Sequence, residues 1–187
     1  MKHIHIRSAV ATGWRTFAQR PWYLIFLSLC VVGISVLTVE HQLFTALSFI
    51  LFGGYIATLL KYFRGGKISF DDMFMLDNRW ISFTFLSLIK AVLVLLGLLC
   101  FIVPGIYLCL RWMFAEFFVL EEGMGPIAAL RASAEMTKGR VGELFLFSAL
   151  SVLLVALGLL CFLIGGVVAL VVVLFASMDI YTRLKSR

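Results

Sequence analysis

The sequence predicts an all-α integral membrane protein with six transmembrane helices arranged as three hairpins. Only 14% of the 187 residues are charged and 63% are hydrophobic, whereas about a quarter of the residues of a soluble domain are charged. The hydrophobic residues gather in four long blocks, and nearly all lysines and arginines lie outside them. This composition excludes an ordinary soluble domain and leaves no room for a soluble catalytic one.

The four blocks divide into six spans because their lengths differ. A hydrocarbon core of about 30 Å requires roughly 20 apolar helical residues, so the first two blocks supply one span each and the last two fold back. The predicted spans are residues 22–39, 43–60, 81–102, 104–120, 144–163 and 166–182. Proline and paired glycines interrupt helices, and the expected turns are 40–42, 103–105 and 165–166. A four-span fold with long, tilted helices is the alternative.

The cations indicate the orientation of the spans, because lysine and arginine near span ends stay on the cytoplasmic side. Every Lys and Arg except Lys90 and Arg111 lies before the first span, in the loops 61–80 and 121–143, or after the last span. The three opposite turns contain none. Both termini are therefore predicted to be cytoplasmic.

A repeated sequence links the hairpins. Leu96–Phe101 recurs as Leu157–Phe162, an offset of 61 that also pairs Arg79 with Arg140. The first hairpin matches the second at an offset of 59, which pairs Arg20 with Arg79. A fixed period indicates one structural unit used several times, so we expect a three-fold internal repeat within a single membrane domain of residues 1–187. The copies are predicted at about 5–62, 67–120 and 125–183.

A short cytoplasmic segment precedes each hairpin and is predicted to form an amphipathic helix. Ser69 suits the start of the second helix, and Pro126 and Gly139 delimit the third. The predicted apolar faces are Ile6, Val10, Trp14 and Phe17 in the first, Phe70, Met73 and Phe74 in the second, and Ile127, Leu130 and Ala134 in the third. Such helices lie in the membrane interface; the alternative is a surface that docks a partner or gates a substrate.

Three charged residues are predicted inside the spans, namely Lys90, Arg111 and Glu116. They need partners, because an unpaired charge at the bilayer centre costs about 3 kcal/mol. If the chain turns beside Pro104, Lys90 and Glu116 lie at nearly equal depth and can form an ion pair. Arg111 then points away from Glu116 and should reach backbone carbonyls, Tyr107 or lipid headgroups. The pair either pins the hairpin or serves solute binding or proton coupling.

Arg20, Arg79 and Arg140 occupy matching places before the three hairpins. We expect them at headgroup depth, where contact with anionic lipid contributes about 1 kcal/mol per cation. Simple marking of the topology is the alternative interpretation. No catalytic, cofactor-binding or metal-binding residue is predicted, and no aromatic and basic module indicates nucleic-acid binding.

One part of the sequence is similar to a known family. The residues that carry the resemblance are Pro104-Gly105-Ile106-Tyr107-Leu108, Arg111, Glu121–Pro126, Ala129–Ser133 and Thr137-Lys138-Gly139-Arg140. They resemble the glycerophosphoryl diester phosphodiesterase membrane-domain superfamily, which includes small YciC-like bacterial inner-membrane proteins of unassigned function. The resemblance implies a six-helix, multi-pass protein of the bacterial inner membrane. The phosphodiesterase domain itself is not expected here, because no soluble stretch holds its Glu, Asp and His cluster.

The predicted function is therefore non-enzymatic. No nucleotide-binding or hydrolase motif occurs, and His3, His5 and His41 lie on opposite membrane faces in the predicted topology. We expect a structural or regulatory protein of the bacterial envelope that needs no cofactor. Its expected partners are membrane lipids, including anionic ones, a membrane protein or a second copy of the chain. A membrane carrier or channel for a small or lipid-like solute is the alternative.

Overall fold

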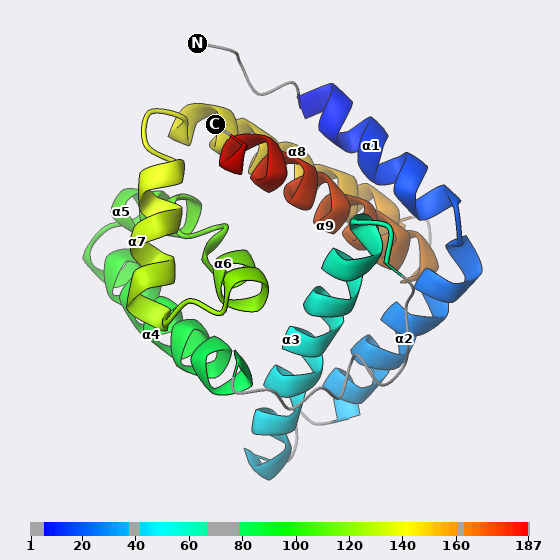
Figure 1. Cartoon of the computed structure of the whole chain (residues 1–187), viewed down its shortest axis with the longest axis horizontal. Helices are drawn as coiled ribbons and strands as arrows, with labels where there is room; N and C mark the ends of the chain where they lie inside the picture. Colours follow the sequence, from blue (N-terminus) through cyan, green and yellow to red (C-terminus); the bar gives the residue numbers. More distant parts are fainter. Residues whose placement is uncertain (1–5, 38–41, 67–78, 161–162, 187) are drawn as a thin grey trace. The chain divides into compact units, whose positions relative to one another are not determined.

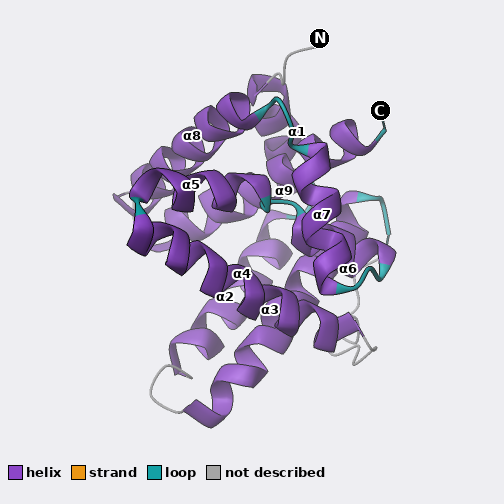
Figure 2. Ribbon diagram, turned by 90° about the vertical axis from the view of Figure 1, so that its left-hand side faces the viewer, coloured by secondary structure: helices purple, strands orange, loops and turns teal. Residues whose placement is uncertain are grey.

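The structure is a computed structural model that describes residues 6–37, 42–66, 79–160 and 163–186 (Figure 1). Almost all of these residues are helical, as predicted (Figure 2). The helices are α1 (Ile6–Ala18), α2 (Pro21–Leu37), α3 (Gln42–Phe63), α4 (Arg79–Cys100), α5 (Ile102–Arg111), α6 (Ala115–Glu122), α7 (Pro126–Met136), α8 (Val141–Leu160) and α9 (Leu163–Lys185). The predicted amphipathic helix after Ser69, and His3 and His5, lie outside the described residues.

Four helical stretches are long and apolar enough to cross a membrane. They are Ile81–Leu99, Ile102–Glu122, Val141–Leu160 and Ile164–Lys185, and α2 contains a shorter apolar stretch, Pro21–Gly33. Large apolar side chains on α4, α5 and α8 are exposed in continuous runs, including Leu95, Leu96, Leu98, Leu99, Phe101, Ile102, Val103, Val152, Leu153, Leu157, Leu159 and Leu160. Soluble monomers rarely leave such patches uncovered, so both observations support a membrane protein.

The chain divides into two compact units. One comprises residues 1–73 and 146–187, with α1, α2, α3, α9 and most of α8, and the other comprises residues 74–145, with α4 to α7. These boundaries differ from the limits of the three predicted repeats, because the second unit contains α7, which was predicted to begin the third repeat.

Helix α9 organises the first unit, since α1, α2 and α3 all pack against it. Figure 1 shows α1 running beside α9. A Cβ atom on Gly13 would lie 2.5 Å from the Val172 carbonyl oxygen and 3.2 Å from the Ala176 nitrogen. Arg183 donates a hydrogen bond of 3.0 Å to the Ser8 hydroxyl near the other end of the contact. The contact thus relies on small residues that let two backbones approach closely.

The apolar faces predicted for the first and third short helices agree with the buried residues only in part. The buried residues are Ala9, Gly13 and Phe17 in α1, and Ala129, Leu130 and Ser133 in α7. Phe17 and Leu130 belong to the predicted faces and are buried, whereas Trp14 and Ile127 are 56% and 61% exposed. The small residues that these helices also bury were not predicted.

Two of the predicted turns are also wrong. Pro104 and Gly105 lie within α5, and Gly165 and Gly166 lie within α9. Pro104 is the third residue of α5, where a missing amide hydrogen costs little because the first amides of a helix have no intrahelical partner. The chain reverses earlier, at Phe101 in the first case.

The glycines near these reversals bring paired helices together. A Cβ on Gly97 would lie 3.0 Å from the Gly105 Cα, and a Cβ on Gly158 would lie 2.5 Å from the Gly165 carbonyl oxygen. Figure 2 shows α4 and α5 lying side by side, as their contacts require. The glycines of the repeated motif therefore permit close approach within each hairpin.

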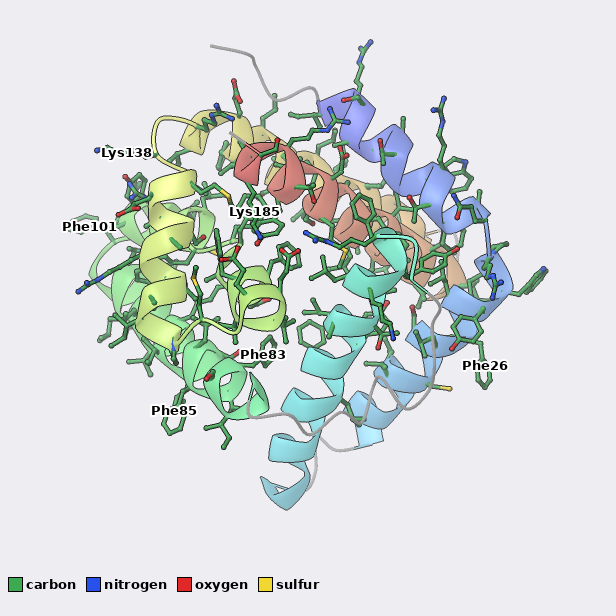
Figure 3. All side chains as sticks on the ribbon, viewed as in Figure 1. Phe26, Phe83, Phe85, Phe101, Lys138 and Lys185 are labelled. Carbon is green, nitrogen blue, oxygen red and sulfur yellow. The ribbon has the colours of Figure 1, made fainter. Side chains whose placement is uncertain are left out.

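Burial follows the same offsets of 59 and 61 as the sequence. The buried residues include Leu24 and Leu27 in α2, Phe83 and Leu86 in α4, and Leu144 and Phe147 in α8. Tyr55 in α3, Phe114 just before α6 and Phe175 in α9 are also buried at matching positions. Phe26, Phe85 and Leu146, also at matching positions, are 58%, 56% and 60% exposed. Figure 3 shows Phe26 and Phe85 pointing away from the ribbon.

The close approach at Gly158 can be tested by comparing two glycines of α8. Gly158→Ala places a methyl group against the backbone of Gly165, and overpacking of this kind costs about 1–3 kcal/mol. We expect a lower thermal unfolding midpoint in detergent. Gly142→Ala is the control, because nothing lies within 4 Å of its Cβ position. Equal midpoints for the two variants would contradict the packing described for this hairpin.

Candidate functional site

The fourth predicted span contains a break, and the functional candidates gather around it. Helix α5 ends at Arg111 and α6 begins at Ala115, so the helix is interrupted, although Ile102–Glu122 as a whole is long and apolar enough to cross a membrane, as predicted for 104–120. The Trp112 amide still reaches the Leu108 carbonyl at 3.0 Å, and the regular pattern is then lost until α6. A break within a candidate membrane span needs other partners for its backbone groups, because lipid supplies none.

Helix α7 provides these partners. The buried Ser133 hydroxyl accepts a hydrogen bond from the Phe114 amide (3.3 Å) and donates one to the Arg111 carbonyl (2.9 Å). The Thr137 hydroxyl, also buried, lies 3.2 Å from the same carbonyl oxygen and 2.8 Å from the Ser133 carbonyl oxygen of its own helix. Both hydroxyls were missed in the sequence, where their spacing of four residues was the available signal.

The predicted ion pair between Lys90 and Glu116 is present. The Lys90 Nζ lies 3.0 Å from a Glu116 carboxylate oxygen, and the two side chains are 20% and 24% exposed. The register used to predict it was wrong, because the chain reverses at Phe101, which is 11 residues from Lys90 and 15 from Glu116. Continuous helices would leave the two about 6 Å apart in depth. The break before α6 allows this helix to pack on α4, and the pair forms.

Arg111 has two of the kinds of partner that were predicted for it. One guanidinium nitrogen donates to the Tyr107 hydroxyl at 2.9 Å, and another donates to the Ala134 carbonyl oxygen at 2.7 Å. The guanidinium carbon also lies 5.6 Å from the centre of the Tyr107 ring, a cation–π distance. That the carbonyl comes from α7 was not predicted. Within the described residues, Arg111 forms no ion pair with a carboxylate.

The three interfacial arginines all stand where a leading span begins. Arg20 immediately precedes α2, Arg79 is the first residue of α4, and Arg140 immediately precedes α8. The Arg20 carbonyl accepts from the Leu24 amide at 3.2 Å, and the Arg140 carbonyl accepts from the Leu144 amide at 3.0 Å. Arg20 is exposed and Arg140 is half-exposed. These arginines therefore have a common local position, separate from the cluster around Arg111.

The charged cluster belongs to the middle hairpin alone. The offset of 61 relates Lys90, Arg111 and Glu116 to Ser151, Val172 and Ser177, and the offset of 59 relates them to Val31, Phe52 and Ala57. Ser151 and Ser177 each donate to a carbonyl of their own helix, at 2.8 Å and 2.7 Å. Two hairpins with the same burial pattern thus form without these charges, which indicates that the hairpin itself does not require them.

Fold and site together define a helical, apolar protein in which Arg111 and the Lys90–Glu116 pair lie beside a helix break. Among the residues that the structure describes, no three His, Cys, Asp or Glu side chains form a group that could hold a metal ion. No protein-family model matches the chain, and no curated protein or solved structure is significantly similar to it. The functional argument therefore depends on the geometry of the cluster.

Charge reversal tests whether Lys90 and Glu116 stabilise each other. Lys90→Glu and Glu116→Lys each place two like charges together, and an unmatched buried charge costs about 3–5 kcal/mol. We expect each single variant to unfold at a lower temperature and the double swap to recover most of the loss, as directly coupled neighbours do. Lys138→Glu, at an exposed position, serves as the control for charge reversal alone. Strictly additive losses would show that the pair contributes no coupling energy.

Proposed function

We propose that the chain is a non-enzymatic, multi-pass protein of the bacterial inner membrane that binds lipid or a protein partner and has a structural or regulatory role in the envelope. The observation that carries this proposal is the cluster of Lys90, Arg111 and Glu116, which the two other hairpins lack. Charges in a membrane span are costly and mark function by default. One of them, Arg111, has donors that the protein does not use, which suits recognition of an anionic group.

The proposed architecture is six spans in three hairpins related by an internal repeat. Matching burial supports it, and so do matching turns: the Arg20 amide donates to the Phe17 carbonyl at 3.3 Å, and the Arg140 amide donates to the Thr137 carbonyl at 3.1 Å. The family resemblance, to the membrane-domain superfamily of the glycerophosphoryl diester phosphodiesterases, forms part of the same proposal. Its residues include Arg111 and, within α7, Pro126 and Ala129–Ser133.

The docking of the short helices gives further support to the repeat. Gly13 of α1 abuts the Val172 carbonyl oxygen of α9. Ser133 of α7 donates to the Arg111 carbonyl oxygen of α5. Gly13 and Ser133 occupy matching positions of the first and third copies, since the offsets 59 and 61 together separate them. Arg111 and Val172 occupy matching positions of the second and third copies, at the offset of 61. Residues at matching positions thus contact carbonyl oxygens at matching positions. The contact is a close approach of Gly13 in one case and a hydrogen bond from the Ser133 hydroxyl in the other.

A cytoplasmic location of both termini is supported by the places of the interfacial arginines. Arg20, Arg79 and Arg140 stand at helix N-termini, where the helix dipole disfavours cations by about 0.3–1 kcal/mol. Helix stability therefore does not explain them. Retention on the cytoplasmic side and attraction to anionic lipid headgroups do.

A carrier or channel for a small or lipid-like solute is the second candidate. The partial exposure of both Lys90 and Glu116 favours it, because a buried pair that solvent or a solute can reach is able to exchange partners. Against it, each of these two side chains already has a charged partner within the second unit, so the ion pair is satisfied without a solute.

Accessibility labelling tests the topology. In a background without native cysteines, Phe101→Cys should react from outside intact cells, because Phe101 is exposed between α4 and α5. Gly125→Cys should react only after the cells are opened, since Gly125 is exposed before α7 and has open space at its Cβ position. Labelling of both residues from the same side would rule out the proposed topology.

Native extraction tests the function. The chain is taken from the membrane in polymer-bounded discs, and the lipids in the discs are compared with the bulk membrane. We expect enrichment of anionic lipid, and less enrichment when Arg20, Arg79 and Arg140 are all replaced by Gln, because each interfacial cation contributes about 1 kcal/mol. Lipids that match the bulk, with neither a stoichiometric protein partner nor a second copy in the discs, would overturn the proposal. Solute uptake into proteoliposomes would then favour the carrier.

A further inference from the structure

The guanidinium of Arg111 has more donors than the protein uses. Arginine carries five N–H groups in a planar fork and has no acceptor. The Tyr107 hydroxyl and the Ala134 carbonyl take one hydrogen bond each. In the described part of the chain, no carboxylate compensates its charge, and Glu116, five residues away, is already paired with Lys90. A cation in a candidate span is thus left with free donors.

These donors are held in a fixed direction. The Arg111 carbonyl is tied to the Ser133 and Thr137 hydroxyls, which fixes the backbone at the end of α5. The guanidinium is tied at two nitrogens and lies near the Tyr107 ring. Because the Tyr107 hydroxyl accepts from Arg111, its own hydrogen remains to be donated to a ligand. A preorganised fork beside a hydroxyl donor suits a phosphate, whose oxygens accept several hydrogen bonds at once.

The surroundings are open and positive. Tyr107 is 45% exposed, and Arg111 is half-exposed. Arg131 lies three residues before Ala134 and Lys138 four residues after it, so both lie on the same side of the helix as Ala134. Both side chains are exposed. Figure 3 shows Lys138 pointing outward at the end of α7. The nearby exposed carboxylate is that of Glu135 on the same helix, so cations outnumber it.

We propose that Arg111 and Tyr107 form a site for the phosphate of an anionic phospholipid. This inference rests on the proposed function and names the ligand and the residues that bind it. Free phosphate has the same chemistry, but the exposed side chains next to the site are apolar, namely Val103 and Ile106 on α5. An acyl chain can cover them, and a hydrated ion cannot. The matching positions of the other hairpins, Val172 and Phe52, cannot bind an anion.

Native mass spectrometry of the full chain tests this site. The protein in a neutral detergent is titrated with phosphatidylglycerol, with phosphatidylcholine and with inorganic phosphate. We expect one tightly bound phosphatidylglycerol, and about tenfold weaker binding in Arg111→Gln, since a hydrogen bond to a charged group contributes about that factor. Tyr107→Phe should weaken binding about threefold through loss of a neutral hydrogen bond. Arg15→Gln is the control, because Arg15 is an exposed cation on α1 with no part in the proposed site, and we expect a change below about twofold.

The outcomes separate this inference from the proposed function. Undiminished phosphatidylglycerol binding by both Arg111→Gln and Tyr107→Phe would overturn the site, even if native discs of the wild-type chain are enriched in anionic lipid. Equal binding of both lipids, or binding of inorganic phosphate without phosphatidylglycerol, would overturn the anionic-phospholipid assignment. If Arg111→Gln does not fold, Tyr107→Phe decides, because its ring can still pack beside Arg111.

Discussion

Helices in an apolar solvent gain nothing from burying apolar side chains against each other, and the structure depends on this constraint. Association in lipid relies on close packing and on hydrogen bonds. The observed contacts follow this rule: Gly13 meets the backbone of α9, Gly97 meets Gly105, and Gly158 meets Gly165. Large residues such as Trp14 are left on the outside. Glycines thus permit the closest approaches between helices, while other large residues, such as Phe83 and Phe175, are buried. Further large apolar side chains remain on the exposed faces, where a helix in water carries polar ones.

The same constraint explains why the polar residues lie where they do. A helix that breaks within a candidate span exposes amide and carbonyl groups that lipid cannot satisfy. The break between α5 and α6 is accompanied by the Ser133 and Thr137 hydroxyls, which bond to the free backbone groups on both sides. Docking of α7 at this point also brings the Ala134 carbonyl to Arg111. One helix break therefore creates both the structural need for α7 and the place where a charged side chain is held.

Features that follow from composition were predicted well from the sequence, and features that depend on how helices pack were predicted poorly. The all-helical fold, apolar stretches long enough to span, and the Lys90–Glu116 pair follow from hydrophobicity, length and charge, which act residue by residue. The turn at Pro104 was predicted wrongly, and the small residues that α1 and α7 bury were not predicted. These features depend on whether a glycine or proline ends a helix or instead lets another helix approach closely. The outcome is decided by a partner helix that can be distant in the sequence. Small residues spaced by four, such as Ala9 with Gly13 and Ala129 with Ser133, were the signal that hydrophobic periodicity obscured.

The repeated sequence allows a comparison within one chain for the role of the charges. Lys90 and Arg111 correspond to Ser151 and Val172 in the last hairpin, which buries the matching residues without them. A group that the shared packing required would be needed in every copy. Charges present in one copy only, each costly in lipid, are instead explained by a task particular to that copy. The Arg111 donors and the exposed Tyr107 give this task a chemical form, the binding of an anion at the end of α5.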